Sequence, residues 1–259
     1  MKIIKSIIVA FSMYSRIPMP RFNWGTEDMK YHFIFFPWVG AVIGLIEYGW
    51  YLLSMNWKLS HMVFTLIAIA IPLVVTGGFH VDGMMDTIDA LSSYQDKEKR
   101  LEILKDPHIG AFSIIGLIEY GLVLVAAIYL MDYRGFIAWT VLFFETRAVS
   151  GICAIRFKKA KNNGLLNTES KTASEKVVVW SLAIQFVVAA IIATMYLQYY
   201  WNVALIALIA VLIYYRIMSY KKFGGVTGDL AGWFVCTAEL FGAVAVAIIS
   251  VLNGRLAWF

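Results

Sequence analysis

The stretch that decides the fold is HMVFTLIAIAIPLVVTGGF, residues 61–79, which contains no Asp, Glu, Lys or Arg. A helix needs roughly 20 apolar residues to cross the ~30 Å hydrocarbon core of a bilayer, so this run is nearly enough by itself. The whole chain has the same character: 61% of its 259 residues are hydrophobic, 15% are charged, and the mean hydropathy is +0.73. A soluble domain of this composition would lack the polar surface to cover itself. We therefore predict an integral membrane protein.

Six other stretches of similar length and composition predict further membrane helices. Together with the first, the seven stretches lie at about 31–54, 61–79, 110–131, 135–155, 176–199, 201–219 and 230–251. No repeat or linker separates them, so we predict one all-α domain over residues 1–259, a polytopic membrane helical bundle of about seven transmembrane helices. The N-terminal MKIIKSIIVAFSMYSRIPMP lacks the small-residue cleavage site of a signal peptide. We expect a short interfacial helix there.

Lysine and arginine gather on one side of this predicted topology. Eighteen of the 22 precede the first span or fall in alternate connections: Lys2, Lys5, Arg16, Arg21, Lys30, Lys97, Lys99, Arg100, Lys105, Arg156, Lys158, Lys159, Lys161, Lys171, Lys176, Arg216, Lys221 and Lys222. The opposite side has Lys58, Arg134 and Arg255. Because positive charge collects in cytoplasmic loops, we predict a cell-membrane protein with a cytoplasmic N-terminus and an external C-terminus. The net charge of +5 thus mostly reflects this topology, although basic loops also suit anionic lipids or phosphorylated substrates. We expect the lipid bilayer as a partner and no nucleic acid.

Three aspartates follow the opening stretch, in GGFHVDGMMDTIDAL, residues 77–91. Asp82, Asp86 and Asp89 are spaced i, i+4 and i+7, which places them along one stripe of a helix. Their mutual repulsion destabilises that helix unless a cation lies between them. Mg²⁺ prefers hard oxygen ligands and often binds carboxylates together with substrate phosphates, so we predict Mg²⁺ here. The alternative is a solvated acidic face balanced by nearby lysine and arginine.

The residues around the stripe leave further alternatives open. His80 is either a ligand or the donor of a structural hydrogen bond, and Gly77, Gly78 and Gly83 either let a ligand approach the backbone or merely break the helix. KDPHIGAF, residues 105–112, offers Asp106 as a phosphate or metal contact or as a plain helix N-cap. FGGVTGDLAGW, residues 223–233, offers Thr227 and Asp229 at a glycine-rich helix start, a feature that can bind anions. By the charge rule all these segments meet on the cytoplasmic side.

Three ionisable residues inside the predicted spans are functional candidates by default. Glu119, Arg147 and Glu239 lie about eight to ten residues from the cytoplasmic end of their spans, roughly 12–15 Å deep at 1.5 Å per residue. Arg147 therefore has Glu119, Glu239 and the neighbouring Glu145 as alternative partners, either in a structural ion pair or in a substrate contact. An ion-coupled carrier using these residues is one alternative function, although its site would lie at mid-membrane in repeated, broken helices. The two cysteines, Cys153 and Cys236, lack a CxxC pattern and are expected to be small core residues.

Five separated motifs resemble one family. SRIPMP (15–20), FFPWVGAVIG (35–44), the 77–91 motif, KDPHIGAF and GGVTGDLAGW followed by Glu239 are similar to cobalamin synthase, the adenosylcobinamide-GDP ribazoletransferase of the corrinoid pathway. The resemblance implies a membrane transferase that uses Mg²⁺ and joins adenosylcobinamide-GDP to α-ribazole or its 5′-phosphate, releasing GMP. It implies a metal and phosphate site at His80, Asp82, Asp86 and Asp89, with Asp106, Thr227 and Asp229 nearby and Arg16 as a phosphate contact. A homo-oligomer is compatible with the sequence.

A second membrane enzyme offers a nearer alternative than the carrier. CDP-alcohol phosphatidyltransferases also use an acidic helix at the membrane surface to displace a nucleoside monophosphate. Their pattern has an arginine after D-G-x-x-A and later G-x-x-x-D-x-x-x-D. Here Asp82 and Gly83 are followed by Met85 and Asp86 with no arginine, so the cobalamin synthase pattern fits better.

Overall fold

The computed structural model describes residues 2–254 except 26, 161–165, 167–169, 171 and 172. Lys161, Lys171 and Arg255, which belong to the charge pattern above, lie outside the described residues. Over the described part the chain is helical, and its one β interaction is an isolated parallel bridge between Lys159 and Val226. The prediction of an all-α membrane bundle is therefore confirmed.

Six of the seven predicted spans are helices long and apolar enough to cross a membrane. They are α2 (Phe36–Asn56), preceded by the 3₁₀ helix η1 (Asp28–Phe35), then α6 (Ala111–Leu130), α7 (Tyr133–Arg156), α9 (Glu175–Leu197), α10 (Tyr199–Met218), extended by the π-helical η2 (Ser219–Phe223), and α11 (Gly228–Leu252). Both cysteines are buried and free. They pack in an apolar cluster, as expected.

The opening stretch differs from its prediction. Its helix, α3 (His61–Thr76), stops at two consecutive left-handed glycines, Gly77 with φ 72° and Gly78 with φ 80°. The next helix, α4 (Phe79–Ser92), leaves at 95° to α3. At 16 residues, α3 is about 24 Å long, short of a full hydrocarbon core. The acidic motif is thus a separate helix almost perpendicular to α3, and α3 and α4 make a seventh span only if the bent pair is counted as one.

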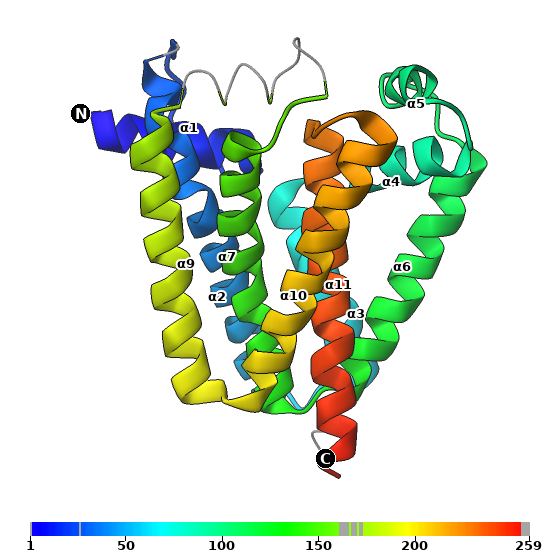
Figure 1. Cartoon of the computed structure of the whole chain (residues 1–259). Helices are drawn as coiled ribbons and strands as arrows, with labels where there is room; N and C mark the ends of the chain where they lie inside the picture. The colour runs from blue at the N-terminus through cyan, green and yellow to red at the C-terminus, as the bar shows by residue number, and fades with distance from the viewer. Residues whose placement is uncertain (1, 26, 161–165, 167–169, 171–172, 255–259) are drawn as a thin grey trace.

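The two ends of the bundle differ in what they carry (Figure 1). At one end α1 (Lys2–Tyr14) lies across the long helices, as predicted for an interfacial helix, and α4 and the short α5 (Lys97–Ile103) lie near the same end. The C-terminus lies at the other end. The basic and acidic segments of the sequence therefore share one end of the molecule.

Helices α7 and α11 form the centre of the bundle. α11 packs against α4, α7, α10 and α6, and α7 packs against α2 and α9. α2 approaches α7 closely through Gly40 and Gly44: a Cβ at Gly40 would lie 2.0 Å from the carbonyl oxygen of Phe143. Small residues spaced by four allow such backbone approach between membrane helices. α7 in turn packs against α11, which also contacts α4.

Candidate functional site

The acidic stripe lies on α4 as the spacing predicted. Asp82 is exposed and Asp86 and Asp89 are half-buried, whereas Met84, Thr87 and Ala90 are buried against the bundle. Burial and then the negative charges of neighbouring carboxylates raise the pKa of Asp86 to about 6; those neighbours are Asp82, Asp229 and Asp89. Both effects disfavour the charged form of Asp86: burial removes the carboxylate from water, and the neighbouring carboxylates repel it.

The start of α11 brings a fourth carboxylate to the stripe. Thr227 is the N-cap, and its hydroxyl accepts a hydrogen bond from the Leu230 amide at 3.2 Å. The same hydroxyl donates to Asp229 Oδ2 at 3.4 Å. A Cβ at Gly83 of α4 would lie 2.8 Å from the Asp229 Cα, so the two backbones touch. Gly83 and Asp229, which are more than 140 positions apart in the sequence, are therefore neighbours in one site.

His80 lies on the buried side of this junction. A Cβ at Gly232 would lie 2.8 Å from the His80 carbonyl oxygen, which fixes the crossing of α4 and α11 at a second point. The imidazole lies against the rings of Phe79 and Phe36, with centroids 3.9 Å and 6.0 Å away. Burial and the charge of Arg147 hold the pKa of His80 well below its usual range. No hydrogen bond from this ring is present among the described residues, so the structural bond considered above is not formed there.

Arg16 reaches the bend between α3 and α4. Its backbone amide donates to the Val75 carbonyl at 2.8 Å. A Cβ at Gly77 would lie 2.3 Å from Arg16 Nε. Gly77 is therefore required both for its left-handed backbone and for the space that the arginine side chain occupies.

Two other predicted residues, Asp89 of α4 and Asp106, lie near the residues that precede α6. Asp89 contacts Gly110, where a Cβ would lie 1.9 Å from its Oδ1. Gly110, not Asp106, is the N-cap of α6, so the N-cap alternative for Asp106 is wrong for that helix. The exposed Asp106 carboxylate instead accepts from the His108 amide at 3.0 Å and contacts His108 Nδ1 at 2.6 Å. It closes a local turn whose backbone precedes α6.

Arg147 has a defined partner in the centre of the bundle. Its Nη1 donates to Glu239 Oε1 at 2.7 Å and to the Phe143 carbonyl at 2.8 Å, and the Thr146 hydroxyl donates to the same carboxylate oxygen at 3.0 Å. Glu119 is instead exposed on α6. The three intramembrane residues thus do not converge on a carrier site.

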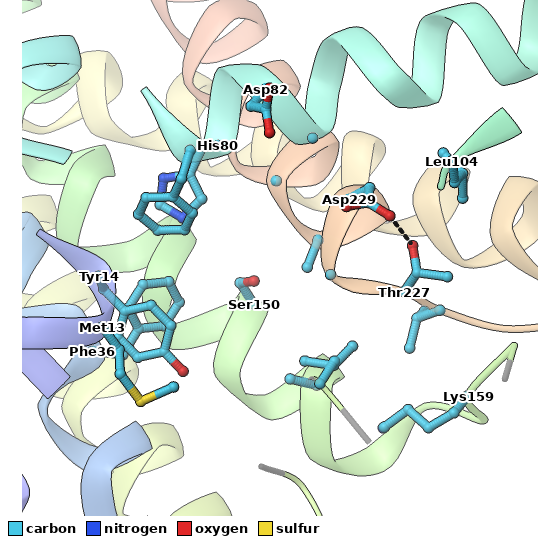
Figure 2. Close-up of a pocket in the computed structure, with 18 of the residues that line it drawn as sticks. Met13, Tyr14, Phe36, His80, Asp82, Leu104, Ser150, Lys159, Thr227 and Asp229 are labelled. Carbon is cyan, nitrogen blue, oxygen red and sulfur yellow. Dashed lines mark hydrogen bonds between the residues drawn. The ribbon is translucent and has the colours of Figure 1, made fainter. Parts of the chain in front are cut away.

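A pocket of about 480 Å³ opens where these elements meet (Figure 2). One part of its lining is aromatic: Tyr14, Phe33, Phe36 and Phe79. Another part is polar or charged: His80, Asp82, Lys105, Ser150, Lys159, Thr227 and Asp229. Figure 2 shows Asp82 and Asp229 on the same side of the pocket, with Tyr14 and Phe36 farther along the wall below His80. The site can therefore hold a molecule with both anionic and flat apolar parts.

Comparison with known proteins assigns this chain to a family. The model of the family described as cobalamin-5-phosphate synthase matches residues 6–247. The chain belongs to the cobalamin-5-phosphate synthase family. A curated relative from Lachnoclostridium phytofermentans named adenosylcobinamide-GDP ribazoletransferase is 39% identical, covering 100% of both chains. Relatives of the same name from Listeria monocytogenes (30% identical, 88% of this chain and 91% of the relative) and Clostridium perfringens (28% identical, 95% and 98%) also match. No solved structure matches.

Within this synthase pocket, several lining residues were not singled out by the sequence. Lys159 and Lys105 entered only the topology count, and the aromatic residues come from α1, η1, α2 and α4. No spacing along the chain connects residues from four such elements. Arg147, Glu239, Asp86 and Asp89 are absent from the described lining of the pocket; the first two are buried in the centre of the bundle, and the two aspartates are half-buried along α4.

The donors at the site suit Mg²⁺ in kind. Asp82, Asp86 and Asp229 are carboxylates with hard oxygens, and burial together with the charges of Asp82 and Asp229 raises the pKa of Asp86. Among the described residues, no three His, Cys, Asp or Glu side chains converge closely enough to form a complete ligand set. Mg²⁺ bound here would therefore have to complete its shell with water and substrate phosphates.

Proposed function

We propose that this protein joins adenosylcobinamide-GDP to α-ribazole or α-ribazole 5′-phosphate and releases GMP at the cytoplasmic face of the cell membrane. The observation that carries the proposal is the pocket in which α4 and α11 bring Asp82 and Asp229 together. Family membership and the names of the relatives support the choice of substrates. The concentration of basic residues at the same end supports a cytoplasmic site.

The chemistry is a substitution at phosphorus. A ribazole hydroxyl oxygen forms a bond to the phosphorus next to the corrinoid, the pyrophosphate P–O bond breaks, and GMP leaves with the bond electrons. Asp82 and Asp229, with Asp86 beside them, would hold Mg²⁺, which when bound neutralises charge on the phosphates and the leaving group. A carboxylate of the same cluster accepts the proton of the attacking hydroxyl. The remaining task of the protein is alignment of the two substrates.

The aromatic part of the lining suits the base of the acceptor. Tyr14 packs on Phe36 with ring centroids 4.3 Å apart, and Phe79 packs on His80. The Tyr14 hydroxyl lies 3.0 Å from His32 Nε2. This hydrogen bond fixes the position of the Tyr14 ring in the lining of the pocket. Flat heteroaromatic rings bind such surfaces by stacking and by burial of apolar area.

The proposal is tested with purified protein, adenosylcobinamide-GDP, α-ribazole 5′-phosphate and Mg²⁺, with GMP and the corrinoid product quantified by chromatography. We expect Asp82→Asn and Asp229→Asn each to lower the rate by about 100-fold or more, since each removes charge aimed at the phosphates. Asp96→Asn is the matched control, because Asp96 caps the peripheral α5 and asparagine caps equally well. Wild-type protein that releases no GMP, or normal rates in the Asn variants of Asp82, Asp86, Asp89 and Asp229, would overturn it.

A further inference from the structure

Lys159 is a cation in the pocket that none of the proposed steps at phosphorus uses. It follows the end of α7 and lines the pocket. Figure 2 shows it across the pocket from His80 and Asp82, on the side of Thr227. Its side chain is half-buried, and burial lowers the pKa of its ammonium group.

The backbone of Lys159 is fixed to the start of α11. The Val226 amide donates to the Lys158 carbonyl at 2.8 Å, and the Ala160 amide donates to the Val226 carbonyl at 3.0 Å. A Cβ at Gly225 would lie 2.4 Å from the Lys158 carbonyl oxygen, so glycine allows this close pairing. Lys159 is therefore held in register with Thr227 and Asp229.

The ammonium group has unused hydrogen-bonding capacity. Its Nζ donates to the Phe157 carbonyl at 2.8 Å, which uses one of three N–H groups. None of the ion pairs between described residues includes Lys159. A partly desolvated cation with no carboxylate partner is stabilised when an anion occupies the space beside it.

We propose that Lys159 binds a phosphate group of a substrate, opposite the carboxylates that would hold the metal. The inference rests on the proposed function for the identity of that substrate. Lysine binds phosphate as a compact point charge. Two phosphates are available, the pyrophosphate of the corrinoid donor and the 5′-phosphate of the acceptor.

The test compares Lys159→Met with Lys158→Met, a matched control whose exposed side chain lies outside the described pocket lining. We expect Lys159→Met to raise KM about 10- to 100-fold for a phosphate-bearing substrate, and Lys159→Arg to recover much of the loss. An increase confined to α-ribazole 5′-phosphate, with α-ribazole unaffected, assigns the acceptor phosphate. A higher KM for adenosylcobinamide-GDP with either acceptor assigns the donor. Unchanged KM values, or a loss confined to kcat, would overturn the inference.

A second measurement is independent of turnover. Inorganic pyrophosphate with Mg²⁺ should raise the thermal stability of the wild-type protein and of Lys158→Met, but raise that of Lys159→Met much less. Equal effects on wild type and Lys159→Met, including no effect on either, would overturn the inference. A wild type that binds pyrophosphate through Lys159 but releases no GMP would instead overturn the proposed function alone.

Discussion

At the residue scale, the site is dominated by crowded carboxylates around Asp86. The spacing along α4 brings Asp82 and Asp89 near it, and the helix crossing adds Asp229. Burial, and then the like charges beside it, disfavour ionisation, so Asp86 holds a proton at a pH where an ordinary aspartate is ionised. A bound cation would relieve the repulsion, whereas a proton competes with that cation.

This competition predicts a pH-dependent requirement for Mg²⁺. The pKa of Asp86 is raised to about 6, so the carboxylate is mostly ionised at pH 7 and mostly protonated at pH 5. We expect the apparent Mg²⁺ affinity in the GMP-release assay to fall about tenfold between these values. In Asp86→Asn the affinity should be weaker throughout but should lose most of this pH dependence. A wild-type Mg²⁺ affinity that is the same at pH 7 and pH 5 would contradict the prediction.

At the element scale, the contact between α4 and α11 assembles the site. Gly83 faces the Asp229 backbone, and Gly232 faces the His80 backbone. The absence of a side chain at both positions lets two helices from distant parts of the chain touch through their main chains. The carboxylates beside the crossing are then placed by backbone packing, which is stiffer than side-chain packing.

Adding a methyl group at this crossing should therefore separate the two carboxylates. In Gly83→Ala the new Cβ would lie 2.8 Å from the Asp229 Cα, and neither backbone can move freely. We expect a destabilisation of roughly 1–3 kcal/mol together with loss of most GMP release, measured by thermal unfolding and by the assay above. Gly121→Ala in α6 is the control, because nothing lies within 4 Å of a Cβ there. Wild-type activity in Gly83→Ala would show that the close crossing is not needed.

At the scale of the whole molecule, the pocket lies at one end of the bundle, called the functional end below, and the C-terminus lies at the other. The pocket, α1, α4 and the first turn of α11 share one end, while the connection between α2 and α3 belongs to the other (Figure 1). Both native cysteines are buried, so introduced cysteines can be labelled against a low background.

This arrangement predicts opposite labelling of two single-residue variants. Asp96→Cys, at the start of α5 beside the functional end, should react with a membrane-impermeant thiol reagent only when the cytoplasmic face is accessible. Lys58→Cys, between α2 and α3, should react from outside in intact cells, since the basic segments at the opposite end are predicted to lie in the cytoplasm. Labelling in permeabilised cells controls for accessibility of each cysteine. Reversed labelling would place the pocket on the outer face.

The sequence determined the helices and the acidic stripe, because both depend on local regularities. Apolar length marked the spans, and the i, i+4, i+7 spacing put Asp82, Asp86 and Asp89 on one helix. It placed the end of the second span too late, because the run 61–79 stays apolar through the glycines at which the backbone turns. An apolar sequence indicates that a segment is buried, but it does not indicate the direction in which the backbone runs.

Only the tertiary structure decided which residues share the pocket. The partner of Arg147 is Glu239 and not Glu119, because helix rotation puts Glu119 on the outer surface of α6. Lys159 joins the site through a pairing with the segment before α11. Such contacts depend on how helices cross and rotate against one another, which follows from packing over the whole bundle and leaves no periodic trace along the chain.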